Sequence, residues 1–437
     1  MLSSNPMEKK VQNAWAFYDW ANSVYSLVIS TAVFPIYFNS VTSVNDQPIH
    51  YELLGMSVPN TTLYSYSLSL SFVLVAIISP FLSGIADHTG KKKRFMQFFC
   101  YLGATSCSLL YFFDGSNIWF GLLMSVLASV GFWGSLVFYN AFLPEVASPD
   151  QQDALSAKGF SLGYIGASLL LIVNLLMIQM PDTFGFNGAG DASRFSFLLV
   201  GIWWAGFAQV SFRRLPDNVY QRVSDERYIW KGFHELRAVW MELKGQLSLR
   251  RFLYSFFFFS IGVQTVILLA GLFGDVELGL DSSKLITTIL IIQFVGIAGS
   301  HLFSFFSRKY GNLQSLKICI VLWALICFGA YTLTKDDPSV ELKFYIIGAV
   351  VGLVMGGIQA ISRSTYSKLL PEETHSHASY FSFYDVTEKV SIVLGTAIYG
   401  LLIDLTGSMK MSVLALSLFF VIGFLLILWV PKTRYVR

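Results

Sequence analysis

The connection between two apolar segments near the start of the chain reads Ser83-Gly84-Ile85-Ala86-Asp87-His88-Thr89-Gly90-Lys91-Lys92-Lys93. A glycine such as Gly90 lets the backbone turn tightly, because it has no Cβ atom. Asp87 would lie at the end of one helix, where its carboxylate can accept hydrogen bonds from the N-terminus of another. The stretch therefore predicts a tight, positively charged turn between two helices, and a contact from its acid to another helix.

The composition on either side of this turn is typical of a protein that crosses a membrane many times. Of the 437 residues, 54% are hydrophobic and 13% are charged, whereas a soluble protein carries about 25% charged residues. The first apolar run is too long for the hydrophobic region of a signal peptide, so we expect none. The net charge of +3 gives no indication of nucleic-acid binding.

Twelve segments are long and apolar enough to span a bilayer, whose core needs about 20 apolar residues per helix. They are residues 14–39, 63–86, 95–113, 117–141, 159–180, 194–212, 251–273, 284–306, 314–334, 342–363, 379–403 and 410–430. The expected fold is an all-α, polytopic membrane protein with two groups of six spans, 1–212 and 251–437, joined by the connection 213–250.

That connection has a helical pattern of its own. Ile229, Phe233, Leu236, Trp240 and Leu243 recur at spacings of three and four residues, with charged residues between them. The pattern predicts an amphipathic helix that lies on the cytoplasmic face of the membrane or against the helix bundle.

The distribution of Lys and Arg predicts the orientation. With the N-terminus inside, 24 of the 30 basic residues lie on cytoplasmic segments and Lys389 lies within a span. The five that lie outside are Arg194, Lys284, Lys335, Lys343 and Lys410. We therefore expect both termini in the cytoplasm.

The first span contains the polar stretch Phe17-Tyr18-Asp19-Trp20-Ala21-Asn22-Ser23-Val24-Tyr25. A charge at the centre of a bilayer costs about 2.5–3.5 kcal/mol, so Asp19 has to face the protein interior or a wet cavity. Asp19, Asn22 and Tyr25 are spaced at i, i+3 and i+6 and share a broad helix face. They either line a path for a solute or form a polar cluster that holds helices together.

Two later spans also carry charged residues. Asp385 and Lys389 are four residues apart and can pair along their own helix. Glu388 is then a lone carboxylate that can take up a proton reversibly. We predict proton coupling for Asp19, Asp385, Glu388 and Lys389. Arg363 either binds a substrate carboxylate through its planar guanidinium or extends to the lipid headgroups.

These stretches together resemble the major facilitator superfamily, and within it the vacuole-effluxer-like branch. Residues 83–93 are similar to the signature loop of the superfamily, although Ser83 stands where that loop usually has its first glycine. Ser307-Arg308-Lys309-Tyr310-Gly311-Asn312 is similar to a degenerate second copy, with Arg308 in place of the acid. The stretches that resemble the branch are residues 18–23, 34–35, 139–145, 156–160, 163–166, 356–364, 370–371 and 383–387.

The resemblance implies two pseudo-symmetric six-helix bundles with a site at mid-depth between them. It also implies that the signature loop latches the cytoplasmic side in the outward-open state. The residues at this gate would be Asp87, Gly90, Lys91, Arg94 and Glu145. Spans one, four, seven and ten line the cavity of that fold. The side chains that we expect to face it are Tyr18, Asp19, Trp20, Asn22, Tyr25, Trp133, Tyr139, Asn140, Gln264, Gln293, Gln359, Arg363 and Tyr384.

We therefore expect a secondary transporter that moves a small polar solute by alternating access, with proton coupling and a role in efflux. An amino acid is the leading candidate, because fungal members of the resembled branch are vacuolar amino-acid exporters linked to autophagy. Asp19 would bind its ammonium group and Arg363 its carboxylate. The alternatives are a sugar, a cell-wall peptide fragment or a drug as the solute, or a membrane sensor that transports nothing.

The remaining expectations concern partners and location. The sequence has no nucleophile–base pair, metal-ligand spacing or cofactor motif, so we expect no enzyme activity, no metal and no cofactor. We expect a monomer in the bacterial plasma membrane that contacts the lipid bilayer and a small-molecule substrate, and no nucleic acid.

Overall fold

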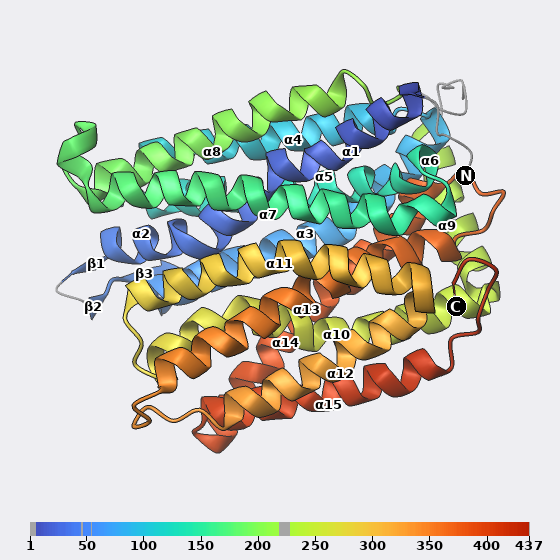
Figure 1. Cartoon of the computed structure of the whole chain (residues 1–437). Helices are drawn as coiled ribbons and strands as arrows, with labels where there is room; N and C mark the ends of the chain where they lie inside the picture. Colours follow the sequence, from blue (N-terminus) through green and yellow to red (C-terminus); the bar gives the residue numbers. More distant parts are fainter. Residues whose placement is uncertain (1–5, 45–46, 54, 218–227, 437) are drawn as a thin grey trace.

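The structure is a computed structural model that describes residues 6–44, 47–53, 55–217 and 228–436. Within these residues, twelve helical segments are long and apolar enough to cross a membrane, as the sequence predicts. They form two six-helix bundles, one above the other in Figure 1.

The N-terminal bundle comprises α1 (Pro6–Val24) with α2 (Phe34–Val41), then α3 (Asn60–Thr89), α4 (Lys92–Leu109), α5 (Ile118–Ala141), α7 (Pro149–Gln179) and α8 (Ala189–Phe212). The C-terminal bundle comprises α10 (Leu247–Leu272), α11 (Ser282–Tyr310), α12 (Asn312–Tyr331), α13 (Val340–Leu369), α14 (His377–Thr406) and α15 (Met409–Leu428). The short helix α6 (Leu143–Val146) follows α5, and α9 (Tyr228–Gly245) lies between the bundles.

Both chain ends lie at one end of the molecule, which we call the terminus side (Figure 1). The opposite end, the hairpin side, carries two small hairpins. Strand β1 (Ser43–Val44) pairs with β2 (Gln47–Pro48), and β3 (His50–Leu53) pairs with β4 (Met56–Pro59). These two ends of the helices serve below as reference points for the site.

Several helices begin well before the apolar segments that predict them. The fifth apolar segment starts at residue 159, but α7 starts at Pro149. Its first turns carry polar side chains such as Asp153 and Ser156, which are buried against the other bundle. Hydropathy alone places such polar residues outside the membrane span. Inside the protein, hydrogen bonds to other side chains and to the backbone satisfy their polar groups.

The first span is not one continuous α-helix. Between α1 and α2 it forms a π-helical segment, η1 (Tyr25–Ala32), followed by a break at Val33. Pro35 sits in the first turn of α2 and has no N–H to continue the helical hydrogen bonds. Ser30 and Thr31 in η1 face the space between the bundles.

The two bundles meet mainly through three pairs of helices, and α5 also contacts α14. α3 packs against α14, and α7 packs against α11 and α13. The α7–α11 contact includes a 2.6 Å hydrogen bond between the hydroxyls of Ser161 and Ser300, both buried. Helices of one bundle thus contact the other mainly along α3, α7, α11, α13 and α14.

Helix α9 lies on the terminus side and contacts both bundles. Its backbone approaches α3 so closely that a Cβ atom on Gly84 would lie 2.2 Å from the carbonyl oxygen of Gly232. On the C-terminal bundle, the ring of Trp240 lies 5.4 Å from that of Phe383. The connection 213–250 therefore contains a helix that packs against the two helix bundles. This is one of the two locations that its sequence pattern allows, the other being the membrane surface.

The predicted apolar stripe of this helix is only partly buried. Leu243 is buried and Leu236 is half-buried, whereas Phe233 and Trp240 are about half exposed, at 49% and 45%. The side chain of Ile229 lies outside the described residues.

Candidate functional site

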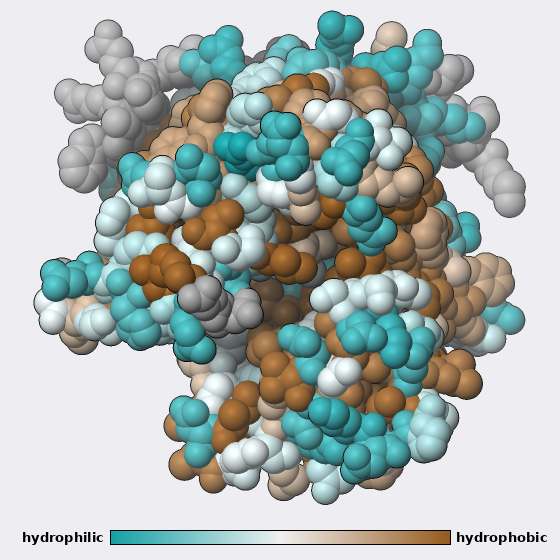
Figure 2. Space-filling view, turned by 90° about the vertical axis from the view of Figure 1, so that its left-hand side faces the viewer, coloured by the Kyte–Doolittle hydropathy of each residue, from teal (hydrophilic) through white to brown (hydrophobic). Residues whose placement is uncertain are grey.

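A cavity of about 290 Å³ lies between the two bundles. Its walls come mainly from α1, η1, α5 and α7 on one side and from α10, α11, α13 and α14 on the other. It extends from Asp19 and Arg363 towards Ser30 and Thr31. Figure 2 views the hairpin side and shows the surface hollowed between the two bundles. The cavity is thus open on the hairpin side and closed on the terminus side.

The floor of the cavity is an ion pair between the bundles. The Oδ2 atom of Asp19 on α1 lies 3.3 Å from Nη1 of Arg363 on α13, and the two side chains are only 6% and 4% exposed. The hydroxyl of Tyr139 on α5 donates a 2.8 Å hydrogen bond to the same Asp19 oxygen. Three helices of two bundles are therefore joined at one carboxylate.

Every N–H group of the Arg363 guanidinium has an acceptor. Nε donates to the hydroxyl of Ser156 and Nη2 to its carbonyl, each over 2.9 Å. Nη1 also donates to Asn140 over 3.4 Å, and both Nη atoms donate to Asp19 over 3.3 Å. An arginine has five N–H donors, and these five bonds use all of them. A substrate carboxylate can bind Arg363 only by displacing one of these partners.

The fit around this ion pair depends on a glycine. A Cβ atom at Gly159 on α7 would lie 2.5 Å from Oδ2 of Asp19 and 3.0 Å from Nη2 of Arg363. The guanidinium carbon also lies 4.2 Å from the ring centre of Phe160 and 4.9 Å from that of Trp15, distances typical of cation–π contacts. These rings shield the ion pair from water on the N-terminal bundle.

A second charged cluster lies on α14, farther along the C-terminal wall. Lys389 Nζ lies 2.9 Å from a carboxylate oxygen of Asp385 and 2.9 Å from one of Glu388. The amide of Gln264 on α10 donates a 2.9 Å hydrogen bond to the other oxygen of Glu388. Lys389 also lies 3.5 Å from the ring centre of Trp133 on α5. The predicted pair Asp385–Lys389 is present, and Glu388 joins it.

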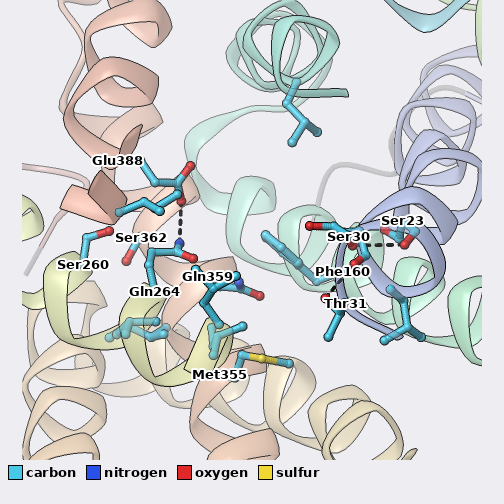
Figure 3. A pocket seen from close by; sticks show the side chains of 18 of the residues that line it. Ser23, Ser30, Thr31, Phe160, Ser260, Gln264, Met355, Gln359, Ser362 and Glu388 are labelled. Atoms are coloured by element: carbon cyan, nitrogen blue, oxygen red, sulfur yellow. Dashed lines mark hydrogen bonds between the residues drawn. The ribbon is translucent and has the colours of Figure 1, made fainter. Parts of the chain in front are cut away.

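Uncharged polar groups are set into a mainly apolar wall (Figure 3). Ser23, Ser30 and Thr31 lie on the N-terminal bundle, across the cavity from the glutamines of α10 and α13. Gln359 on α13 accepts a 2.8 Å hydrogen bond from the hydroxyl of Tyr164 on α7. The walls can therefore offer hydroxyl and amide hydrogen bonds to a polar solute.

On the terminus side, Asp87 connects the two bundles. Its two carboxylate oxygens accept backbone hydrogen bonds from Ala378 over 3.1 Å and from Ser379 over 2.6 Å, in the first turn of α14. The partial positive charge of a helix N-terminus favours such a carboxylate. Gly90, just after α3, has a φ of 68°, the left-handed conformation that the tight turn requires.

Glu145 adds a second contact of this kind. It forms an ion pair with Lys92 on α4, and Nδ1 of His377 on α14 lies 3.0 Å from the same carboxylate. Lys91 and Arg94, which the resemblance places at the gate, are exposed. The structure places the neighbouring Lys92 in the buried contact instead.

The degenerate second copy of the loop forms a latch with the acid on the opposite helix. Asp153, near the start of α7, accepts hydrogen bonds of 2.8 Å from the side chains of Ser307 and Asn312. It also lies 2.7 Å from Nζ of Lys368 at the end of α13. Arg308 replaces the acid in the loop, and Asp153 supplies the carboxylate from the N-terminal bundle.

The structure places most of the predicted cavity residues on the cavity wall. These are Asp19, Asn22, Trp133, Asn140, Gln264, Gln293, Gln359, Arg363 and Tyr384. Glu388, which is predicted to couple protons, also lies on the wall. Tyr139 lies beneath the wall and bonds Asp19, while Asp385 and Lys389 lie behind Glu388.

Tyr18, Trp20 and Tyr25 lie inside the N-terminal bundle instead. Their rings contact those of Tyr139, Trp203 and Phe132, respectively. At about 100° per residue, a residue six positions after Asp19 is turned by about 120° from it, which is too far to share its face. The predicted common face therefore holds for Asn22 and not for Tyr25.

Sequence reasoning missed several polar residues that complete these contacts between and within the bundles. They are Lys92, Asp153, Ser156, Lys368 and His377. Each lies at the polar end of a helix, where a sequence alone is equally compatible with solvent exposure. Their positions just outside the apolar segments were the available signal, but the pairing is between residues far apart in the chain.

All four cysteines are free and buried: Cys100, Cys107, Cys319 and Cys327. In the part of the chain that the structure describes, no group of three or more His, Cys, Asp or Glu side chains is arranged to hold a metal ion.

Comparison with known proteins gives one family and close relatives. The model of the family described as "Vacuole effluxer Atg22 like" matches residues 7–437. The MFS-type transporter YxiO of Bacillus subtilis is 30% identical over 97% of this chain and 95% of its own length. Autophagy-related protein 22-1 of Penicillium rubens is 25% identical over 92% of this chain and 80% of its own length.

Solved structures confirm the fold. The proton:xylose symporter XylE superposes with a TM-score of 0.73 at 12% identity, over 98% of this chain and 97% of that one. A bacterial homologue of the iron transporter ferroportin, in an outward-facing state, superposes with a TM-score of 0.68 at 11% identity, over 97% and 99%. The first of these is described as a protein of the major facilitator superfamily, whose fold the sequence predicts for this chain.

Proposed function

This chain belongs to the Atg22-like vacuole effluxer family of major facilitator transporters, and we propose that it exports a small amino acid by alternating access, coupled to protons. The observation that carries the proposal is the cavity between the bundles, whose mainly apolar wall carries hydroxyl, amide and charged groups. It is open on one side and closed on the other by the Asp19–Arg363 ion pair. A volume of about 290 Å³ is at the lower end of the range for small-molecule sites.

The closed side would be the cytoplasmic side. The terminus side carries the basic loops, which favours its placement in the cytoplasm. The chain would then lie in the plasma membrane of a bacterium in an outward-open state, with the cavity facing the exterior. A single chain forms the whole cavity, so we propose that it works as a monomer.

Opening to the cytoplasm would require the floor to come apart. Asp19 and Arg363 sit on different bundles, so a rocking motion of the bundles separates them. A zwitterion can exchange into this pair, with its carboxylate replacing Asp19 on Arg363 and its ammonium group on Asp19. The bonds to Asp19 reach Oδ2, so the Oδ1 atom is the position that we assign to the ammonium group. In this way binding and opening would be one event.

Proton coupling would use the carboxylates in or beside the cavity. Asp19, Asp385 and Glu388 are such groups, and Lys389 holds the last two in place. Each of these carboxylates can take up one proton and release it again, so a proton can bind and leave during the transport cycle.

The test is transport by the purified chain in proteoliposomes with an imposed pH gradient. We expect accumulation or release of a labelled amino acid that depends on the gradient, and loss of transport in Asp19→Asn. The matched control is Asp404→Asn, the same change at an exposed acid of α14, which should transport like the original chain.

Unchanged transport and unchanged pH dependence in Asp19→Asn would remove this residue from the mechanism. A thermal-shift screen with amino acids, sugars, peptidoglycan fragments and drugs separates the possible solutes, because a bound ligand stabilises the state that binds it. A shift with sugars alone would contradict the amino-acid proposal, and the absence of any transported solute would contradict transport itself.

A further inference from the structure

The charges that line the cavity do not cancel. Asp19 and Arg363 neutralise each other at the floor, and Glu388 is the third charged residue on the wall. Behind it, Asp385 and Glu388 share the single ammonium group of Lys389. The cavity and the cluster behind it therefore carry one net negative charge, located on α14.

Lys389 cannot supply a second positive charge. Its side chain is 1% exposed, and its ammonium group is held between two carboxylates and the ring of Trp133. Within the described residues, Oδ2 of Asp385 is buried without a hydrogen-bond partner. Glu388 is 19% exposed at its side chain and is the member of the cluster that a solute in the cavity can reach.

Among the described residues, the helices packed against α14 bring no compensating charge to this cluster. Helices α3, α5, α9, α10 and α15 pack against α14. Helix α5 has no charged residue, and α9 lies at the terminus side. Apart from tyrosines, the titratable residues of α3, α10 and α15 lie at the ends of these helices. They are Asp87, His88, Arg250, Arg251 and Lys410. The neutral side chains of Gln264 and Trp133 face the cluster instead.

We propose that Glu388, together with Asp385, Lys389 and Gln264, forms a cation site that a proton and an ammonium group of the solute occupy in turn. The inference rests on the proposed transport function and names its substrate class. The solute would be a small amino compound of net charge +1, such as a basic amino acid, and it would exchange for a proton.

The physical reason is the cost of closing the cavity around an uncompensated charge. An isolated carboxylate inside the membrane is unfavourable, so the bundles close readily only after one positive charge has entered. A proton or a cationic solute provides that charge, whereas a zwitterion of net charge zero does not. The contact of Lys389 with Trp133 shows that the same wall accepts an ammonium group beside an aromatic ring.

The exchange balances in protons and charge. When the solute arrives from the cytoplasm, its ammonium group takes the place of the proton on Glu388, and that proton passes to water on the cytoplasmic side. After release of the solute on the outer side, a proton from that side returns to the carboxylate. Each cycle therefore moves one cation out and one proton in.

The experiment compares L-lysine with L-norleucine, which has the same carbon chain without the side-chain ammonium group. Binding to the purified full chain is measured between pH 5 and pH 8, and counterflow is measured in proteoliposomes. We expect lysine to bind at least about tenfold more tightly than norleucine at pH 8. Once the site is mostly protonated, lysine affinity should fall by up to about tenfold for each unit of pH decrease, as competition with a proton requires.

The key variant is Glu388→Gln, which keeps the size of the side chain and can still accept hydrogen bonds. It should bind lysine and norleucine within about twofold of each other, with no dependence on pH. Asp404→Asn on the same helix is exposed and should behave like the original chain. If Glu388→Gln does not yield folded protein, Asp385→Asn is the second variant. It should lower the preference for lysine over norleucine.

Three results would overturn the inference. They are equal affinity for lysine and norleucine in the original chain, a lysine preference that survives in Glu388→Gln, and competition by Na⁺ in place of protons. If norleucine is transported as well as lysine, the cation site fails while amino-acid transport stands. If the chain binds and transports neither compound nor any other amino acid, the proposed function fails as well.

Discussion

Gly159 controls whether the floor of the cavity can close. A methyl group at this position would lie 2.5 Å from the Asp19 oxygen that binds Arg363, so the ion pair would have to separate. Overpacking of this kind costs about 1–3 kcal/mol, and a difference of that size changes an equilibrium about 5- to 150-fold. We expect Gly159→Ala to weaken the state that is closed on the terminus side by this factor.

The readout is labelling of a cysteine placed at Ser362, which lines the cavity near its floor. In inverted membrane vesicles, a water-soluble maleimide should label it faster in the Gly159→Ala background. Gly206→Ala is the control, because that helical glycine of α8 has no atom within 4 Å of an added Cβ. Equal labelling rates in both backgrounds would show that Gly159 does not support the closed floor.

Individual residues also show the limit of sequence reasoning. The sequence places Asp19 and Arg363 in a protein interior because charges in a bilayer are costly. It cannot show that they bind each other, because 344 positions separate them in the chain. Nor can it show that Arg363 has no N–H left for a substrate, since this depends on Ser156 and Asn140 from two further helices.

At the scale of elements, the two latches are related but have opposite polarity. In one, Asp87 in the last turn of α3 accepts hydrogen bonds from the first turn of α14. In the other, Ser307 at the end of α11 and Asn312 at the start of α12 supply the donors, and Asp153 of α7 supplies the acid. Both join the same two bundles on the terminus side, so each stabilises the same state.

Removal of Asp153 should therefore shift the equilibrium towards opening on the terminus side. Asp153→Asn leaves Lys368, whose side chain is 5% exposed, without its carboxylate. The loss of one partner of a buried ion pair costs about 3–5 kcal/mol. The shift is measured by spin-label distances across the terminus side, with labels on α4 and α12.

The double variant Asp153→Asn with Lys368→Met tests the pairing itself. It removes both charges, so we expect it to recover part of the loss. If the two single effects simply add, the two side chains do not interact in the functional state.

Most helices could be predicted from the sequence because each carries an apolar segment longer than a bilayer core. Their true ends could not, as α7 shows. It begins at Pro149, and its polar first turns are buried by α11 and α13 from the other bundle. The position of α9 was also open, because an amphipathic helix fits a membrane surface and a protein surface equally well.

At the scale of the whole molecule, the open and closed sides of the cavity give a test of orientation. All four native cysteines are buried, so maleimide labelling of a single added cysteine can be measured without removing them. Thr31 is exposed and lines the cavity towards the hairpin side. In intact cells we expect an impermeant maleimide to label Thr31→Cys and not the original chain.

Tags at the two chain ends provide the complementary measurement. Both ends lie on the terminus side (Figure 1), so antibodies should reach neither tag until the cells are opened. Labelling of Thr31→Cys only in inverted vesicles would reverse the orientation proposed above.

The π-helical segment η1 begins between Asp19, at the floor of the cavity, and the hydroxyls of Ser30 and Thr31, which lie within η1 near the mouth of the cavity. A π-helical turn holds more residues than an α-helical one, and each residue of an α-helix turns the chain by about 100°. Deletion of a single residue in η1 would let the span wind regularly and would rotate its two ends against each other. The carboxylate and the hydroxyls could then no longer point into one chamber, so this irregular winding sets the angular phase between the gate and the entrance.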